Sequence, residues 1–245
     1  DTGTPPSYAR ELYNNFVVSV QATGATLILL GGNHDSAAVL GESRSLLACL
    51  NTQVIPTLTE SSVIPLKNRA GATAALLCAL PYLRPRDVIT SQAGQGLAEK
   101  QQSLQQAIVD TYKAQFSRAK AMRDQYGPLP LLATGHLTTV GAQTSDSVRE
   151  IYIGTLEAFH VSGFPDFDYI ALGHIHRPQK VGGLEHIRYS GSPIALSFDE
   201  AAQQKQVLLI ELGNTTLQTV TPLSVPRFQP MQALRGSLDT LADSI

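Results

Sequence analysis

Apolar positions recur at helical spacing in some segments of the chain and in short continuous runs in others. Residues 9–20 carry apolar side chains at helical spacing, with Ser7 expected to cap this helix and Gly24 to end it. A weaker helical pattern covers residues 42–50, and the longest one covers residues 97–125. These segments predict helices on the faces of a sheet.

Short apolar runs bounded by Gly, Pro or polar residues predict the strands of that sheet. The expected strands are residues 25–30, 53–55, 62–66, 72–80, 129–134, 167–172, 187–190, 207–212 and 217–221. Residues 137–166 are expected to form a loop with a short helix. Strands and helices that alternate in this way predict an α/β fold.

Composition excludes few classes of protein. The 245 residues, 43% of them apolar, suffice for one large domain or for a domain with a small appendage. The net charge of −2 gives no support for nucleic-acid binding, and it does not exclude a local basic patch. Cys49 and Cys78 lack CxxC spacing, so free buried thiols are expected. Neither a signal-peptide pattern nor an apolar run of about 18 residues is visible, which predicts a cytoplasmic protein.

Three of the predicted strands end in glycine followed by residues that can bind metal ions. Gly32-Asn33-His34, Gly135-His136 and Gly173-His174-Ile175-His176 stand at these ends. Glycine permits a sharp turn or a close approach, and neutral imidazoles and an Asn carbonyl oxygen bind manganese, zinc or iron. We therefore expect the side chains to converge at one edge of the sheet. His174 and His176 face the same way if their segment is extended. The isolated His160 and His186 are interpreted as surface or packed residues.

These motifs, with Asp35, resemble the third, fourth and fifth motifs of the calcineurin-like metallophosphoesterases. Longer stretches are similar to the bacterial repair nucleases within that superfamily, and the likeness covers essentially the whole chain. These stretches are residues 1–13, 83–87, 133–142, 151–155, 169–177 and 189–193. The resemblance implies a metallophosphoesterase-type β-sandwich flanked by helices.

The resemblance also implies roles for single residues. Asn33, His136 and His174 would bind one metal ion and His176 a second. His34 would stand beside the ions and stabilise or protonate the leaving oxygen. Asp35 would either orient the imidazole of His34 or cap the turn.

Other residues near the motifs are candidates for contacts with substrate. Arg84, Arg86, Arg149 and Arg177 are near enough in sequence to meet phosphates, and Arg177 beside the GHxH motif is the preferred one. Surface solvation is the alternative for each arginine. Residues 189–193 are expected to form a turn, either at the rim of the site or with a purely structural role.

The chain also departs from the resemblance. The Asp-x-His of the first motif and the Gly-Asp of the second, which supplies the bridging carboxylate, are missing, and Asp1 corresponds to the residue after the second. We therefore expect a fragment, truncated at both ends, that lacks the first strands and has an incomplete dimetal site. Residues 1–204 would form the nuclease domain and residues 205–245 the beginning of a capping domain.

The leading hypothesis is a DNA nuclease that uses two divalent metal ions to cut DNA ends and hairpins. The expected ion is Mn²⁺. The resemblance implies an SbcC-type ATPase as partner, a homodimer, a nucleoid-associated location and work in DNA repair, recombination and replication. One alternative is a calcineurin-like phosphoesterase for a small-molecule or protein phosphoester. Another is a non-catalytic remnant that binds DNA or a partner.

Overall fold

The structure, a computed structural model, describes residues 3–60, 62–89, 96–145, 148, 158–234 and 236–237. Its helices are α1 (Ser7–Gln21), α2 (Ala37–Gly41), α3 (Arg44–Ala48), α4 (Pro85–Val88) and α5 (Leu97–Tyr126), with 3-10 turns η1 (Val161–Gly163) and η2 (Phe198–Glu200). Its strands are β1 (Leu27–Leu30), β2 (Thr52–Ile55), β3 (Val63–Lys67), β4 (Thr73–Cys78), β5 (Leu131–His136), β6 (Tyr169–Gly173), β7 (Gln179–Val181), β8 (Leu184–Tyr189), β9 (Gln206–Leu212) and β10 (Leu217–Ser224).

A six-stranded mixed sheet, in the order β3-β4-β5-β6-β8-β7, forms the centre of the domain. Strands β4, β5, β6 and β8 are parallel, while β3 and β7 join the two edges in antiparallel orientation. Strands β1 and β2 form a separate parallel pair, and β9 and β10 form an antiparallel hairpin. The predicted α/β fold, a central mixed sheet flanked by helices, is thus confirmed.

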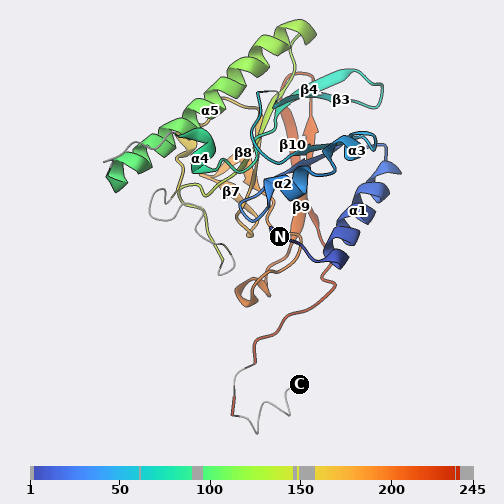
Figure 1. Cartoon of the computed structure of the whole chain (residues 1–245), viewed down its shortest axis with the longest axis vertical. Helices are drawn as coiled ribbons and strands as arrows, with labels where there is room; N and C mark the ends of the chain where they lie inside the picture. The colour runs from blue at the N-terminus through green and yellow to red at the C-terminus, as the bar shows by residue number, and fades with distance from the viewer. Residues whose placement is uncertain are drawn as a thin grey trace.

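Helix α5 covers one face of the central sheet and builds the main core. Its buried side chains recur about one turn apart and pack on alternate residues of the strands, as the periods of helix and strand require. The helix contributes Leu104, Ile108, Tyr112 and Ala119, and the strands contribute Leu76, Cys78, Leu131, Ala133 and Ile170. Figure 1 shows α5 running along one side of the molecule, with α1 on the opposite side.

The hairpin β9–β10 packs against the opposite set of strand positions. Ala75, Leu132 and Tyr169, each one residue out of step with the α5 face, form a cluster with Ile210, Leu212, Leu217 and Val220. The hairpin therefore forms a second β layer against the central sheet. The division of the chain into two domains at residue 205 stays a prediction.

The first helix and the β1–β2 pair form a smaller core of their own. Val17 of α1 packs with Leu47 and Val54, while Tyr8, Leu12 and Phe16 are 74%, 72% and 52% exposed. An apolar stripe therefore remains uncovered on the outer face of α1. No helix in the described part of the chain has the length and apolarity needed to span a membrane.

Some local expectations were wrong. Pro6 occupies the N-cap of α1, because the helix begins at Ser7 itself, and the expected second helix is shorter and follows the unpredicted α2. Helices as short as α2 and α4 leave no periodic pattern to detect. Cys78 is buried as expected, whereas Cys49 is exposed at the end of α3.

The predicted loop at residues 137–166 is described only in part. It contains the 3-10 turn η1 and a bridge between Thr139 and Phe159. Residues 146–147 and 149–157 lie outside the described residues, and so does Asp1.

Candidate metal centre

One open cavity of about 800 Å³ collects the side chains that the sequence motifs singled out. Its lining includes Asn33, His34, Asp35, His136, His174 and His176. Ser190, Gly191 and Ser192 also line it, as the alternative that placed residues 189–193 at the site predicted. The side chains converge as the sequence pattern predicted, and their role as metal ligands stays a prediction.

Parallel strands bring these residues together. In the β5–β6 ladder His136 pairs with Gly173, so the GH and GHxH motifs end side by side. The strand β1 ends beside them, because Gly32, two residues after β1, lies so close to His136 that a Cβ on it would be 2.9 Å from the ring. The carboxyl ends of these strands therefore form the floor of the cavity, where α/β sheets place their ligands.

Two glycines allow the ring of His136 to fit between the neighbouring turns. A Cβ on Gly32 would lie 2.9 Å from Cε1 of His136, and one on Gly173 would lie 3.0 Å from its Nδ1. Any larger residue at Gly32 would force the imidazole to move. The glycines of the motifs thus serve close packing around His136.

His136 and Asn33 face one another in this space. His136 Nε2 lies 2.7 Å from Asn33 Oδ1. Burial, helped by the nearby His34 and His176, lowers the pKa of His136 to about 4. The ring is therefore neutral near pH 7 and has a lone pair that a cation can use.

His174 has an unfavourable backbone conformation and an unfavourable ring environment. Its backbone φ is +91°, a conformation that costs an L-residue about 1–3 kcal/mol. The extended turn assumed for the GHxH motif is therefore wrong, although both histidines do line the cavity. His174 is 8% exposed, and its Nε2 is buried with no hydrogen-bond partner among the described residues. Burial lowers the pKa of His174 to about 3, helped by the neighbouring histidines.

His176 has a different environment, because a carboxylate holds its ring. His176 Nδ1 lies 3.1 Å from Oε1 of Glu200, a fully buried residue of η2. The sequence motifs did not identify Glu200, since it lies in a turn outside any strand end. An acidic residue in a Phe-Asp-Glu turn carries no signal of this role.

The remaining candidates differ in their surroundings. Asp35 Oδ2 accepts a hydrogen bond from the N–H of Gly32 over 2.7 Å, which is the turn-capping alternative. Arg84 donates to the carbonyl of Asp35 over 3.0 Å, so it supports the same turn. Arg177 is exposed and does not belong to the cavity lining, so its predicted proximity to a phosphate has no support in the structure. Arg149 lies outside the described residues.

The chemistry of the donors fits a divalent cation. Ligand atoms that are neighbours around one octahedral ion, each about 2.1 Å from it, lie about 3 Å apart, close to the His136–Asn33 separation. A buried imidazole nitrogen without a partner, as in His174, calls for an explanation such as an ion. In the described residues, no three side chains from His, Cys, Asp and Glu form a metal site by themselves. A cation held in this cavity would therefore need Asn33 beside the histidines.

The sequence comparisons find relatives of this chain. No family model matches the sequence. The chain is 55% identical to SbcD, a component of the nuclease SbcCD, of Escherichia coli over 98% of its length, which is 60% of that protein. It is 33% identical to SbcD of Rhodobacter capsulatus, over 85% of this chain and 52% of the relative. With SbcD of Bacillus subtilis it shares 26% identity over 86% of this chain and 53% of the relative.

The chain therefore spans between half and 60% of the length of these curated relatives. The similarity to the E. coli protein extends over 241 residues of this chain. This chain is thus a relative of the SbcD proteins of SbcCD nucleases, and its similarity to the E. coli protein covers 98% of its length.

Proposed function

We propose that this chain is part of a Mn²⁺-dependent DNA nuclease that hydrolyses phosphodiester bonds at DNA ends and hairpins. The observation that carries the proposal is the convergence of Asn33, His136, His174 and His176 from different strand ends on one cavity. The 55% identity to a component of a nuclease supports the choice of reaction. Work in DNA repair, recombination and replication is part of the same proposal.

The proposed ligand roles are those that the resemblance to the calcineurin-like metallophosphoesterases implies. Asn33, His136 and His174 would hold one divalent ion, and His176 would contribute to a second. Bound divalent ions would draw charge from the phosphate and make water a stronger nucleophile. His136 and His174 suit this task because their lowered pKa values keep both rings neutral near pH 7. Mn²⁺ accepts the mixed nitrogen and oxygen donors that these residues offer.

His34 would act on the substrate directly. It lines the cavity next to Asn33, and the Gly32–Asp35 hydrogen bond closes the turn that carries it. Histidine side chains in general titrate near neutral pH, so they can hold a proton and donate it to a departing oxygen. We assign this proton transfer to the leaving 3′ or 5′ oxygen of the DNA strand to His34.

The second metal position would need further ligands besides His176. The family's Asp-x-His and its bridging Gly-Asp are absent, so we propose that the chain by itself has impaired activity. His176 alone cannot hold a structural or catalytic ion, since such sites take at least three protein ligands.

Two other functions remain as alternatives to the nuclease. A phosphoesterase for small-molecule or protein esters would use the same ligands, and a non-catalytic remnant would bind DNA or a partner without hydrolysis. The long similarity to proteins of a nuclease favours the nuclease over both.

We further propose an SbcC-type ATPase as a partner and a homodimer as the assembly, in the cytoplasm with the nucleoid. The relatives are each named as one component of SbcCD, and this name supports an SbcC-type ATPase as the partner. The exposed stripe of Tyr8, Leu12 and Phe16 supports the homodimer, because an apolar stripe on one helix can pack against the same stripe of a second copy.

The test compares three substrates, and it compares this chain with a longer polypeptide. Linear DNA, a DNA hairpin and bis(p-nitrophenyl) phosphate are each incubated with Mn²⁺, with and without EDTA. The chain is tested alone and with an added N-terminal extension that carries a strand with Asp-x-His and then Gly-Asp. The proposal expects EDTA-sensitive DNA cleavage that rises sharply in the longer polypeptide and falls with His34→Gln. Cleavage of the aryl ester alone would favour the small-ester alternative, and DNA binding without cleavage would favour the remnant.

A further inference from the structure

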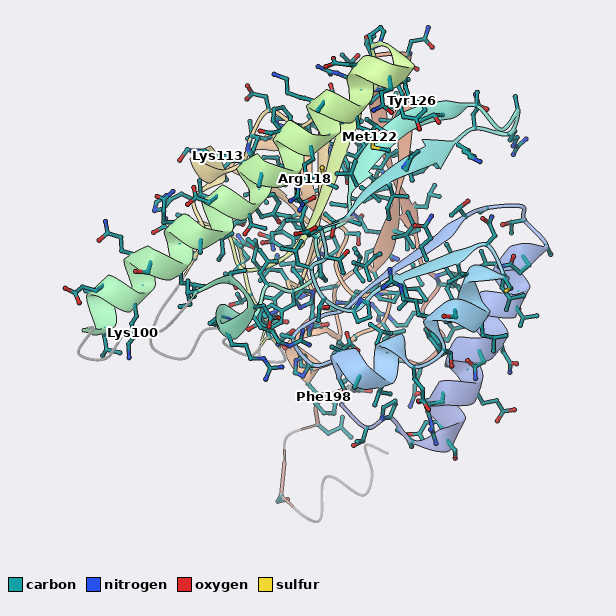
Figure 2. All side chains as sticks on the ribbon, turned by 45° about the horizontal axis from the view of Figure 1, so that its top comes forward. Lys100, Lys113, Arg118, Met122, Tyr126 and Phe198 are labelled. Atoms are coloured by element: carbon teal, nitrogen blue, oxygen red, sulfur yellow. The ribbon has the colours of Figure 1, made fainter. Side chains whose placement is uncertain are left out.

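A buried ion pair stands directly behind the cavity. Glu200 is fully buried, Lys205 is 6% exposed, and Lys205 Nζ donates to Glu200 Oε2 over 2.7 Å. Both residues follow the rim turn in the sequence, and Figure 2 shows Phe198, in the same turn as Glu200, at the end of the domain away from Tyr126 of α5. Charges buried to this extent persist only when each is paired and hydrogen-bonded.

The carboxylate of Glu200 collects several donors. Ser145 Oγ donates to Oε1 over 2.5 Å, and the N–H of Leu196 donates to Oε2 over 3.1 Å. His176 Nδ1 lies 3.1 Å from Oε1. Since a carboxylate that pairs with Lys205 accepts hydrogen bonds, Nδ1 of His176 carries the hydrogen of this contact. Nε2 of His176 then keeps its lone pair.

The lysine holds the backbone of the same residue. Lys205 Nζ donates to the carbonyl of His176 over 3.1 Å and to Ser192 Oγ over 3.0 Å. The N–H of Ser192 donates to the same carbonyl over 3.1 Å. His176 is therefore held at its ring by the anion and at its main chain by the cation of one buried pair.

We propose that Glu200 is the positioning residue of His176, with Lys205 as its counter-charge: together they set the tautomer and direction of the ring that faces the cavity. Histidines that bind metal ions commonly donate their other ring N–H to a carboxylate, and loss of that carboxylate typically lowers metal affinity about 10–100-fold. That His176 binds a metal ion rests on the proposed function. The tautomer of His176 rests on the hydrogen bonds alone.

The experiment uses two double variants that differ only at position 200. Glu200→Gln/Lys205→Met, the amide variant, removes both charges but keeps an acceptor for Nδ1–H. Glu200→Met/Lys205→Met, the thioether variant, removes both charges and the carbonyl acceptor. Glu185→Met/Lys180→Met, which removes an exposed ion pair of the β7–β8 hairpin, is the matched control. Circular dichroism and urea unfolding establish that each variant is folded.

The first readout is the tautomer of His176 in metal-free protein, from ¹⁵N NMR of histidine-labelled samples, with His176→Gln for assignment. The wild type, the amide variant and the control should hold the Nδ1–H tautomer. The thioether variant should shift towards Nε2–H. An Nε2–H ring in the wild type, or equal tautomers in the two position-200 variants, would overturn the proposal.

The second readout is Mn²⁺ binding, followed by the EPR signal of free Mn²⁺. Asn33, His136 and His174 should hold one ion equally in the wild type and in both double variants, because His176 belongs to the second metal position. If the wild type binds no Mn²⁺ while its tautomer depends on position 200, positioning by Glu200 stands and the proposed metal function fails. If loss of the carbonyl acceptor at position 200 weakens this ion about 10–100-fold, His176 shares it with the other three ligands and its assignment to a second position fails.

Discussion

His136 Nε2 and Asn33 Oδ1 lie 2.7 Å apart although 103 residues separate them in the chain. One residue ends β5 and the other follows β1, and the strands that carry them belong to different sheets. The contact joins the β1–β2 unit to the central sheet at the candidate site. Changes in this packing should therefore affect stability and cation binding together.

The absence of a side chain at Gly32 should matter because of His136. Gly32→Ala places a Cβ 2.9 Å from His136 Cε1, so we expect a loss of about 1–3 kcal/mol in the free energy of unfolding. In a His136→Ala background the same change should cost at least about 1 kcal/mol less. Urea unfolding of the four proteins measures this coupling. Effects that add within about 0.5 kcal/mol would show that the two positions do not clash.

The backbone at His174 should prefer glycine. Because φ is +91°, the His174→Gly protein should be more stable than His174→Ala by about 1–2 kcal/mol. At His186, within strand β8, the order should reverse, since glycine weakens a strand by about 0.5–1 kcal/mol relative to alanine. Urea unfolding in EDTA compares the four variants. A His174→Ala protein more stable than His174→Gly would argue against the positive φ at this position.

Breaking the buried pair should be far more damaging than removing it. Lys205→Met leaves the fully buried Glu200 without its cation, and we expect a loss of about 3–5 kcal/mol in the free energy of unfolding. Glu200→Met/Lys205→Met should restore most of this loss, because apolar residues of similar volume can replace a buried pair. Thermal and urea unfolding report the difference. A double variant as unstable as the single one would contradict this account.

Acid should destabilise the metal-free chain through His136 and His174. Their pKa values are about 4 and 3 in the fold against the usual 6.5, so the unfolded chain binds more protons below pH 6.5. Stability is complete above pH 6.5 and falls as the pH drops towards 4, by at most about 1.4 kcal/mol per pH unit for each group.

Unfolding in urea with EDTA at pH 7 and pH 5 measures this loss. The loss should shrink in His136→Gln and in His174→Gln. It should persist in His160→Gln, whose ring is exposed. An equal loss in all three variants would assign the acid sensitivity to other groups.

The exposed face of α1 should carry self-association. Leu12, which is 72% exposed between Tyr8 and Phe16, is changed to Glu to place a charge in the middle of the stripe. Sedimentation velocity should show a dimer for the wild type and at least a tenfold weaker dimer for Leu12→Glu. Leu97→Glu, at the start of α5 on the opposite side of the molecule, is the control (Figure 1). A monomeric wild type, or equal weakening by both changes, would remove α1 as the interface.

Local pattern was sufficient to predict much of the fold. The apolar runs of β5 and β6 and the helical spacing of α5 were predicted within two residues of their ends. Each of these elements is long or strongly apolar, so its period is visible without knowledge of its neighbours. The short elements α2, α4 and β7 were not predicted, because a few residues carry no detectable period.

The candidate site was also predicted from the sequence only in part. The order of residues was enough to predict that Asn33, His136, His174 and His176 meet, because each follows a glycine at or just after the end of a strand and parallel strands deliver their ends to one edge. The positive φ of His174 and the places of Glu200 and Lys205 behind His176 became visible only in the folded chain. These features depend on turns packed against one another from distant parts of the chain, and such contacts leave no periodic trace in a sequence.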